Sequence, residues 1–335
     1  MEAEYKSFIG LPGGGEISRC YYPFKLDPYG KGCSHNCTYC YARSTLSFRG
    51  LWGEAAPASF DKIERVFANA FDRNARGHIN ELLRRRVPLR LGSMTDAFAE
   101  AERVHGLTRR VLALLRDYDY PYLILTKSSS IEDYIDVLDP RLAYAQFSIT
   151  SPYDDIAAKY EPGASSPVAR LRACRTLTNA GIYTAVRINP MFPMYKDGHY
   201  SLGVVSEPFR YFGWELLDMA AEAGAKTVIA GFVRLSSWNI RWIKDATGED
   251  LRWLFDVEAK QANQALHFST EEKRYYYEEA RDRCNALGID FSVCYDGDDA
   301  YEAFRYLWAN HNDCCNALGN IPAFPAVADA SIWKK

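Results

Sequence analysis

The sequence predicts one large α/β unit, an open (βα)6 barrel with a C-terminal extension. Strand-like and helix-like segments alternate along residues 61–230, which is typical of a parallel sheet covered by helices. About six such units can be recognised, fewer than the eight of a closed barrel. The region after Arg234 changes character and becomes rich in Trp, Tyr and charged residues. We therefore expect the barrel in residues 1–234 and an extension packed on it in residues 235–335.

The elements are placed by the spacing of apolar residues. Short apolar runs predict strands at residues 17–22, 89–92, 122–126, 143–149, 183–188 and 226–230. Helical spacing predicts helices at residues 61–72, 107–118, 167–180, 212–223, 271–287 and 300–309. The helix at 167–180 is followed by Gly181, which is a stop signal.

The composition excludes several classes of protein. Hydrophobic residues make up 48% of the chain, charged residues 25%, and the net charge is −3, which does not indicate a surface coated for nucleic-acid binding. A local basic patch or a set of solvated helix faces is formed by Arg84, Arg85, Arg86, Arg90, Arg109 and Arg110. Nine cysteines are too few for a disulfide scaffold. Because neither a signal peptide nor a membrane span is evident, we expect a cytoplasmic protein with reduced thiols.

Three cysteines lie close together in the pattern C-x3-C-x2-C, formed by Cys33, Cys37 and Cys40. Thiolates are the usual ligands of iron–sulfur clusters, and three of them leave the fourth iron of a cubane open. The open iron can bind a small chelating molecule. The alternative is zinc, with His35 as a fourth ligand, but this tight spacing differs from the two separated pairs of a zinc ribbon.

The motif, with an aromatic residue before its third cysteine, resembles the signature of the radical S-adenosylmethionine (SAM) superfamily. The segments DPYGKGCSHNCTYCYAR, LGSMTDAF, LILTKSS, AQFSITS and EPGASSPVARLRACRTLTNAGI resemble its spore photoproduct lyase-like branch, over residues 22–193. The resemblance implies a [4Fe-4S] cluster held by Cys33, Cys37 and Cys40, and SAM on the open iron. It also implies that an electron from the cluster cleaves SAM to a 5′-deoxyadenosyl radical, which takes a hydrogen atom from substrate.

The resemblance places cofactor-binding residues at the carboxyl ends of the strands. It implies that Ser93, Thr95 and Asp96 contact the SAM amino group and ribose, although these residue types also favour turns and caps. Lys127 matches a lysine that contacts the SAM carboxylate. Alternatively, it is simply a charged residue where a buried strand reaches solvent. Ser148 matches a serine that contacts SAM, and its alternative is a bond to backbone.

Further residues are implied around the cofactor. Arg187 and Asn189 are expected to contact the adenosine or the substrate, although Arg187 could equally pair with Glu161. Tyr39 is expected over the adenine region, and Tyr41 matches a tyrosine that relays a hydrogen atom near the substrate. The alternative for both tyrosines is packing around a buried cluster.

The sequence departs from spore photoproduct lyase in its cysteines. That enzyme has a hydrogen-donor cysteine a few dozen residues after the motif, whereas here none occurs between Cys40 and Cys174. Tyr41, Cys294 or Cys314 could replace it, and Cys314 and Cys315 could instead bind a second metal, fold over the site or simply be buried. We therefore expect base modification or isomerisation more than dimer repair.

The resemblance alone supplies the substrate class, a thymine-type base in DNA, with flavodoxin or ferredoxin as electron donor. Bases and phosphates could be bound by the aromatic and basic residues Trp238, Trp242, Trp253, Arg234, Arg241 and Arg252, or these could form a docking face. Two other functions remain open: a radical SAM enzyme acting on a peptide or small metabolite, and a zinc-stabilised nucleic-acid-binding module without catalysis.

Overall fold

The computed structural model describes residues 4–11, 20–193, 212–255, 265–294 and 303–324, and confirms the predicted α/β class. One sheet has the order β1-β2-β5-β6-β7-β8-β9-β12, and two small sheets pair β3 with β4 and β10 with β11. Every pairing in the large sheet is parallel except that of β1 with β2. Its strands are β1 (Ile9–Gly10), β2 (Lys25–Leu26), β5 (Leu89–Leu91), β6 (Tyr122–Thr126), β7 (Ala143–Ser148), β8 (Tyr183–Met191), β9 (Thr227–Phe232) and β12 (Asp290–Val293).

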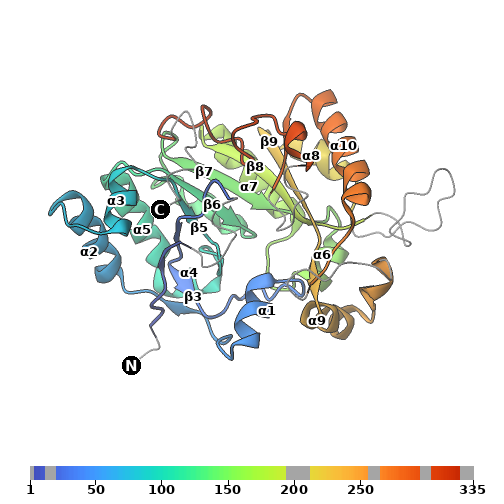
Figure 1. Ribbon diagram of the computed structural model, residues 1–335, viewed down its shortest axis with the longest axis horizontal. Helices are drawn as coiled ribbons and strands as arrows, with labels where there is room; N and C mark the ends of the chain where they lie inside the picture. The colour runs from blue at the N-terminus through green and yellow to red at the C-terminus, as the bar shows by residue number, and fades with distance from the viewer. Residues whose placement is uncertain (1–3, 12–19, 194–211, 256–264, 295–302, 325–335) are drawn as a thin grey trace.

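The helices surround this sheet (Figure 1). They are α1 (Tyr41–Phe48), α2 (Phe60–Phe71), α3 (His78–Arg84), α4 (Glu100–His105), α5 (Leu107–Asp117), α6 (Asp154–Tyr160), α7 (Pro167–Asn179), α8 (Glu215–Glu222), α9 (Ser237–Thr247) and α10 (Thr270–Ala286). The short strands are β3 (Tyr29–Gly30), β4 (Ala56–Pro57), β10 (Leu235–Ser236) and β11 (Ala265–Leu266), and 3-10 turns occupy Ser129–Tyr134, Leu251–Leu254 and Arg305–Leu307. No helix in these described ranges has the length and hydropathy needed to cross a lipid bilayer.

Local signals explain several helix ends. Ser166 caps α7 by accepting from the backbone N–H of Ala169 at 3.2 Å, with Pro167 at the first helical position. Gly181 follows α7 with a φ of 83°, as expected for a stop signal. Ser269 and Glu272 form a capping box at the start of α10.

Two predicted elements differ from the structure. In addition, one strand of the large sheet comes from the region predicted as the C-terminal extension. In the predicted strand at 17–22, residues 17–19 lie outside the described residues and 20–22 are not a strand; the first parallel strand is β2. In the predicted helix at 300–309, residues 300–302 lie outside the described residues and Arg305–Leu307 forms a 3-10 turn. Strand β12 pairs with β9, so residues after 234 contribute to the sheet itself. The domain boundary at 234 stays a prediction.

The register of the sheet shows which side chains share a face. Arg90 pairs with Leu123, Leu123 with Tyr144, and Tyr144 with Tyr183. We call the face that carries these residues the inner face. Because side chains alternate along a strand, the same face carries Lys127, Gln146, Ser148, Arg187 and, beyond β12, Cys294.

The C-terminal segment closes the inner face near the amino ends of the strands. The Tyr144 hydroxyl donates to the Cys315 carbonyl at 2.7 Å, and the Asn316 amide donates to Thr227 and Asp290 at 3.0 and 2.7 Å. The buried Asp313 carboxylate accepts from three backbone N–H groups and from the Tyr22 hydroxyl. This arrangement brings the adjacent Cys314 and Cys315 to the floor of the inner face.

Candidate functional site

The cysteine motif forms a loop between β3 and α1. Cys37 is buried, whereas Cys33 and Cys40 are partly accessible. Backbone bonds from Asn36 to Cys33 and from Cys40 to Cys37, at 3.3 and 3.2 Å, fold the segment into two successive turns. The Cys40 sulfur also accepts from the backbone N–H of Arg43 at the start of α1. The spacing of the motif therefore places three sulfurs on one short loop.

Residues distant in the sequence hold this loop in place. Gly163 approaches so closely that a Cβ there would lie 1.9 Å from the Ser34 carbonyl oxygen, so this position requires glycine. The backbone N–H of Thr38 donates to the Tyr160 carbonyl at 2.9 Å. The Asn239 amide on α9 donates to the Thr38 and Cys40 carbonyls at 3.2 and 3.3 Å. These contacts fix the loop beside the carboxyl ends of the strands.

The three thiols have the chemistry that a metal cluster needs. Burial raises the pKa of Cys33 to about 12 and also raises the pKa values of Cys37 and Cys40, because no bulk water solvates a thiolate there. A bound metal supplies the positive charge that deprotonates such ligands.

The distances between ligand atoms differ between a cluster and a single metal ion. In the described part of the chain, only the donor atoms of Asp313, Cys314 and Cys315 form a group of three that lie within 4.8 Å of one another. Thiolates on one zinc ion, with bonds of about 2.3 Å, lie about 4 Å apart. The three loop sulfurs do not form such a compact group in the described part of the chain.

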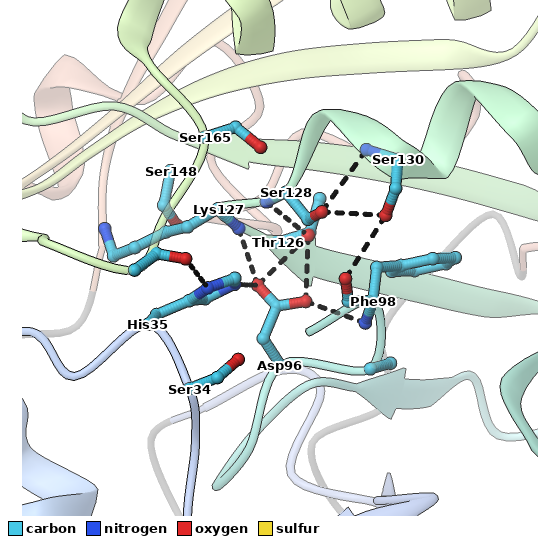
Figure 2. A network of polar contacts seen from close by, with 12 residues as sticks. Ser34, His35, Asp96, Phe98, Thr126, Lys127, Ser128, Ser130, Ser148 and Ser165 are labelled. Atoms are coloured by element: carbon cyan, nitrogen blue, oxygen red, sulfur yellow. Dashed lines mark hydrogen bonds and ion pairs between the residues drawn. The ribbon is translucent and has the colours of Figure 1, made fainter. Parts of the chain in front are cut away.

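Asp96 is the centre of a polar network that joins the cysteine loop to β6 (Figure 2). Its carboxylate accepts from the Thr126 hydroxyl at 2.9 Å and from the backbone N–H groups of Phe98 and Lys127 at 2.9 and 2.6 Å. It lies 3.0 Å from His35 Nε2, and the other ring nitrogen of His35 faces the Gly163 carbonyl. Burial opposes ionisation, but His35 and the N–H donors prevail and lower the pKa of Asp96.

The other two residues predicted to contact SAM after β5 also bind the protein. The Thr95 hydroxyl donates to the Gly32 carbonyl of the cysteine loop at 2.8 Å. The Ser93 hydroxyl and backbone N–H donate to the Asp27 carboxylate at 2.9 and 2.7 Å. Contact of Ser93, Thr95 and Asp96 with SAM stays a prediction, while the present bonds of Thr95 and Asp96 position the cysteine loop.

Glu161 is the centre of a second network, which the sequence analysis missed. Its side chain is 2% exposed and forms an ion pair with Arg170, whose side chain is 1% exposed. Its carboxylate also lies 3.2 Å from Lys127 Nζ and accepts from the Thr150 and Tyr39 hydroxyls. Burial raises the pKa of Glu161, but Arg170 and Lys127 lower it by more, so the carboxylate is ionised.

This second network places Lys127 beside the cysteine loop. Lys127 Nζ lies 5.4 Å from the centre of the Tyr39 ring, and Lys127 and Glu161 both act electrostatically on Cys37. Arg170 also donates to the carbonyls of Ser148 and Ser165, each at 2.7 Å. The segment EPGASS, which supplies Glu161, Gly163 and Ser165, was the sequence signal for this region, although the role of its glutamate was not recognised.

Arg187 does not pair with Glu161, so that predicted alternative is wrong. Arg187 instead donates to Gln146 Oε1 at 3.1 Å and to the Cys294 sulfur at 2.6 Å. The reason is that Glu161 lies beside α7, where Arg170 reaches it, whereas Arg187 projects from the middle of the inner face. Asn189, farther along β8, packs against Gly231, since a Cβ there would lie 2.4 Å from its amide nitrogen.

The two tyrosines of the motif differ in their environment. Tyr39 is buried, and its ring lies edge-on to Phe192 with centroids 6.2 Å apart. Tyr41 is 63% exposed, and its hydroxyl donates to the Ser93 carbonyl. Cys174 and Cys284 are fully buried.

An aromatic surface lies beside the cysteine loop, on α9. The rings of Trp238 and Trp242 are 5.8 Å apart, and the Arg43 guanidinium of α1 lies 4.1 Å above Trp242. Trp238 is 42% exposed. We call Trp238, Trp242 and Arg43 the α9 aromatic surface. The side chain of Trp253 lies outside the described residues, and Arg252 pairs with Asp250 on the protein surface.

Comparison with known proteins agrees with this geometry. A sequence model described as the radical SAM superfamily matches residues 28–200. A radical SAM Nalpha-GlyT isomerase of Pseudomonas phage M6 is 27% identical over 286 residues, covering 81% of this chain and 53% of that protein. Spore photoproduct lyase of Geobacillus sp. (strain Y412MC61) is 26% identical over 192 residues, covering 56% of this chain and 47% of that protein. The chain spans about half the length of both relatives.

Solved structures show the shared fold. A spore photoproduct lyase variant with bound S-adenosylmethionine and dinucleoside spore photoproduct superposes with a TM-score of 0.61 at 19% identity, covering 86% of this chain and 87% of that one. The superfamily match extends over more than half of the 335 residues. The protein therefore belongs to the radical SAM superfamily, with a [4Fe-4S] cluster and S-adenosylmethionine as its cofactors.

Proposed function

We propose that this radical SAM enzyme acts on a nucleobase, a thymine-type base in DNA, and modifies or isomerises it. We further propose that Cys33, Cys37 and Cys40 hold the cluster. The observation that carries the proposal is the buried cysteine loop, fixed beside Lys127 at the carboxyl edge of the sheet. A bound cluster would supply the electron for cleavage of SAM, and SAM would supply the radical that takes a hydrogen atom from the substrate.

In this proposal, side chains of the protein bind and orient the cofactor. Lys127 is held by Glu161 and offers its remaining N–H groups to the SAM carboxylate. Ser148 on β7 and Asn189 on the neighbouring strand β8 are proposed to contact the rest of the cofactor. Tyr39 and the surrounding core exclude water, which protects a reactive radical.

Hydrogen transfer is proposed for Tyr41, Cys294 and Cys314. Tyr41 and Cys294 both lie within electrostatic range of Arg90 and Arg187. Cys314 lies deeper, next to Cys315 on the C-terminal segment. The electron donor is proposed to be a flavodoxin or ferredoxin, in the reducing cytoplasm where thiols stay free.

The nucleic-acid substrate is supported by two independent points. The relatives include spore photoproduct lyase and the phage Nalpha-GlyT isomerase, and a structural neighbour holds a dinucleoside. The α9 aromatic surface also offers an exposed ring and a guanidinium directly beside the cysteine loop, a combination that suits base stacking and phosphate contact.

A turnover experiment tests this proposal. Reconstituted protein is incubated anaerobically with dithionite, SAM and thymine-containing single-stranded or duplex DNA, and 5′-deoxyadenosine and deuterium exchange with the product are measured. We expect 5′-deoxyadenosine to depend on DNA that contains thymine or a thymine derivative. Formation of 5′-deoxyadenosine that no DNA increases, but that a peptide or metabolite does, would contradict the proposed substrate.

A surface variant tests the DNA contact separately. Trp238→Ala is expected to weaken DNA binding about 5- to 100-fold, because stacking of one base contributes about 1–3 kcal/mol. Binding is measured by fluorescence anisotropy at several salt concentrations, since phosphate contacts give a steep salt dependence. The exposed Tyr306→Ala serves as a matched control on another face. Equal affinities of the two variants would exclude Trp238 from the DNA surface.

A further inference from the structure

Two arginines project from the inner face, and neither forms an ion pair with an acidic side chain in the described part of the chain. Arg90 lies on β5 and Arg187 on β8, and the sheet register places them on the same face. Each acts electrostatically on the other and on Tyr41. Both side chains are partly accessible, so this is not a sealed core position.

Their hydrogen-bonding capacity is only partly used. Arg187 donates to Gln146 and Cys294, which are both neutral acceptors. Arg90 Nη1 lies 3.9 Å from the Cys20 sulfur, and its buried Nε has no hydrogen-bond partner among the described residues. Gln146 accepts from Arg187 through Oε1, and its side chain also forms a hydrogen bond with Cys315. Arg90 and Arg187 therefore lie on the same face of the sheet, and each has N–H groups left over.

The neighbouring acidic groups do not neutralise the pair. The nearby Asp27 carboxylate forms an ion pair with Lys25 at 3.4 Å and accepts two bonds from Ser93. Burial raises the pKa of Cys20 to about 11 and also raises the pKa of Cys294, so these thiols stay neutral. A hydrogen bond from Cys314 lowers the pKa of Cys315, so one thiolate at most faces two guanidinium groups.

A metal ion is a poor occupant for this region. Asp313, Cys314 and Cys315 have ligand atoms within 4.8 Å of one another, but the carboxylate already accepts four hydrogen bonds. Arg187 also acts electrostatically on both thiols, and its positive charge opposes a cation there. The excess of donors and positive charge instead favours an anion.

We infer that Arg90 and Arg187, the latter held by Gln146, bind an anionic oxygen group of the substrate, a carboxylate or a phosphate. This inference rests on the proposed function and narrows its substrate class. The carboxylate source would be an acidic substituent on the base, and the phosphate source would be the nucleotide backbone. The anion would lie beside Tyr41, and so would position the reacting part of the substrate next to the cysteine loop.

Binding to the cluster-loaded full chain with SAM, without reductant, tests the inference. The probes are thymidine, thymidine 5′-monophosphate and 5-carboxymethyl-2′-deoxyuridine, and dissociation constants come from calorimetry. We expect one anionic probe to bind at least about tenfold more tightly than thymidine, because hydrogen bonds to charged groups contribute about 1.5–3 kcal/mol. The anionic probe that binds more tightly than thymidine identifies the source of the anion.

Variants then assign that gain to the two arginines. Arg90→Gln and Arg187→Gln are each expected to weaken binding of the favoured anionic probe about 10- to 100-fold, and binding of thymidine much less. Arg187→Lys should retain part of the affinity because it keeps the charge. The exposed Arg85→Gln is the matched control and should bind all probes as the wild type does.

The outcomes separate this inference from the proposed function. Equal affinity of the wild type for all three probes, no binding of any probe, or glutamine variants that bind like the Arg85 control would overturn the anion site. Wild-type protein is assayed separately with dithionite, SAM and thymine-containing DNA. Absence of 5′-deoxyadenosine in that assay would refute the proposed function, whatever the binding data show.

Discussion

Replacement of Cys37 by alanine is expected to abolish cluster loading and SAM cleavage. Cys37 is the buried member of the loop, and two remaining thiolates cannot hold a cubane in this low-polarity position. Iron content after anaerobic reconstitution should fall from about four atoms per chain to less than about one. Formation of 5′-deoxyadenosine should fall to background. Iron and sulfide analysis and chromatography of the nucleoside measure both effects.

Cys174→Ala is the matched control for this substitution. Cys174 is also buried but lies in α7, so its replacement should reduce stability through lost packing and leave iron content unchanged. Circular dichroism confirms that both variants are folded. A Cys37→Ala protein with full iron content and wild-type turnover would contradict the assignment of the loop. So would an anaerobic wild-type protein that loads with zinc but never with iron, since zinc supplies no electron.

Replacement of Glu161 by glutamine is expected to destabilise the protein by about 3–5 kcal/mol. The change leaves the Arg170 guanidinium, which is 1% exposed, without its carboxylate. It also releases Lys127, so SAM binding should weaken as well. Urea unfolding measures the stability loss, and calorimetric titration with SAM measures the affinity.

The Glu161 effect should depend on pH in a defined direction. The pKa of Glu161 is lower in the folded protein than in the unfolded chain. The stabilisation that Glu161 contributes is therefore present above its pKa in the unfolded chain, about 4.3, and is lost as the pH falls through its pKa in the folded protein. The stability difference between wild type and Glu161→Gln should shrink below about pH 4.3. A difference that stays constant down to acid unfolding would contradict the ion pair.

Glu132→Gln is the control for the same type of pair on the surface. Glu132 lies 2.7 Å from Arg172, which is 64% exposed and belongs to the same helix as Arg170. Solvent screens this pair, so its loss should cost about 0–1 kcal/mol. Equal costs for the two substitutions would mean that the burial of Arg170 contributes nothing.

Much of the fold was predictable because its signals are local. Strand β6 agrees with the predicted range at both ends, and α5 and α7 agree to within one residue at each end, since apolar spacing and caps act over a few neighbouring residues. Strand β12 lies in the region predicted as an extension, and its place in the main sheet was not predicted. Pairing of β12 with β9 is decided by packing between segments far apart in the chain.

The sequence by itself determined the cysteine spacing, and with it the superfamily, because three ligands of one cluster can lie within one loop. Only the tertiary structure decided the partners of Glu161 and Arg187. Lys127, Arg170 and Cys294 reach them from other elements, and several partners fit the local pattern equally well. Ion pairs and hydrogen bonds act over a few ångströms in space, and sequence separation carries no information about which side chains come that close.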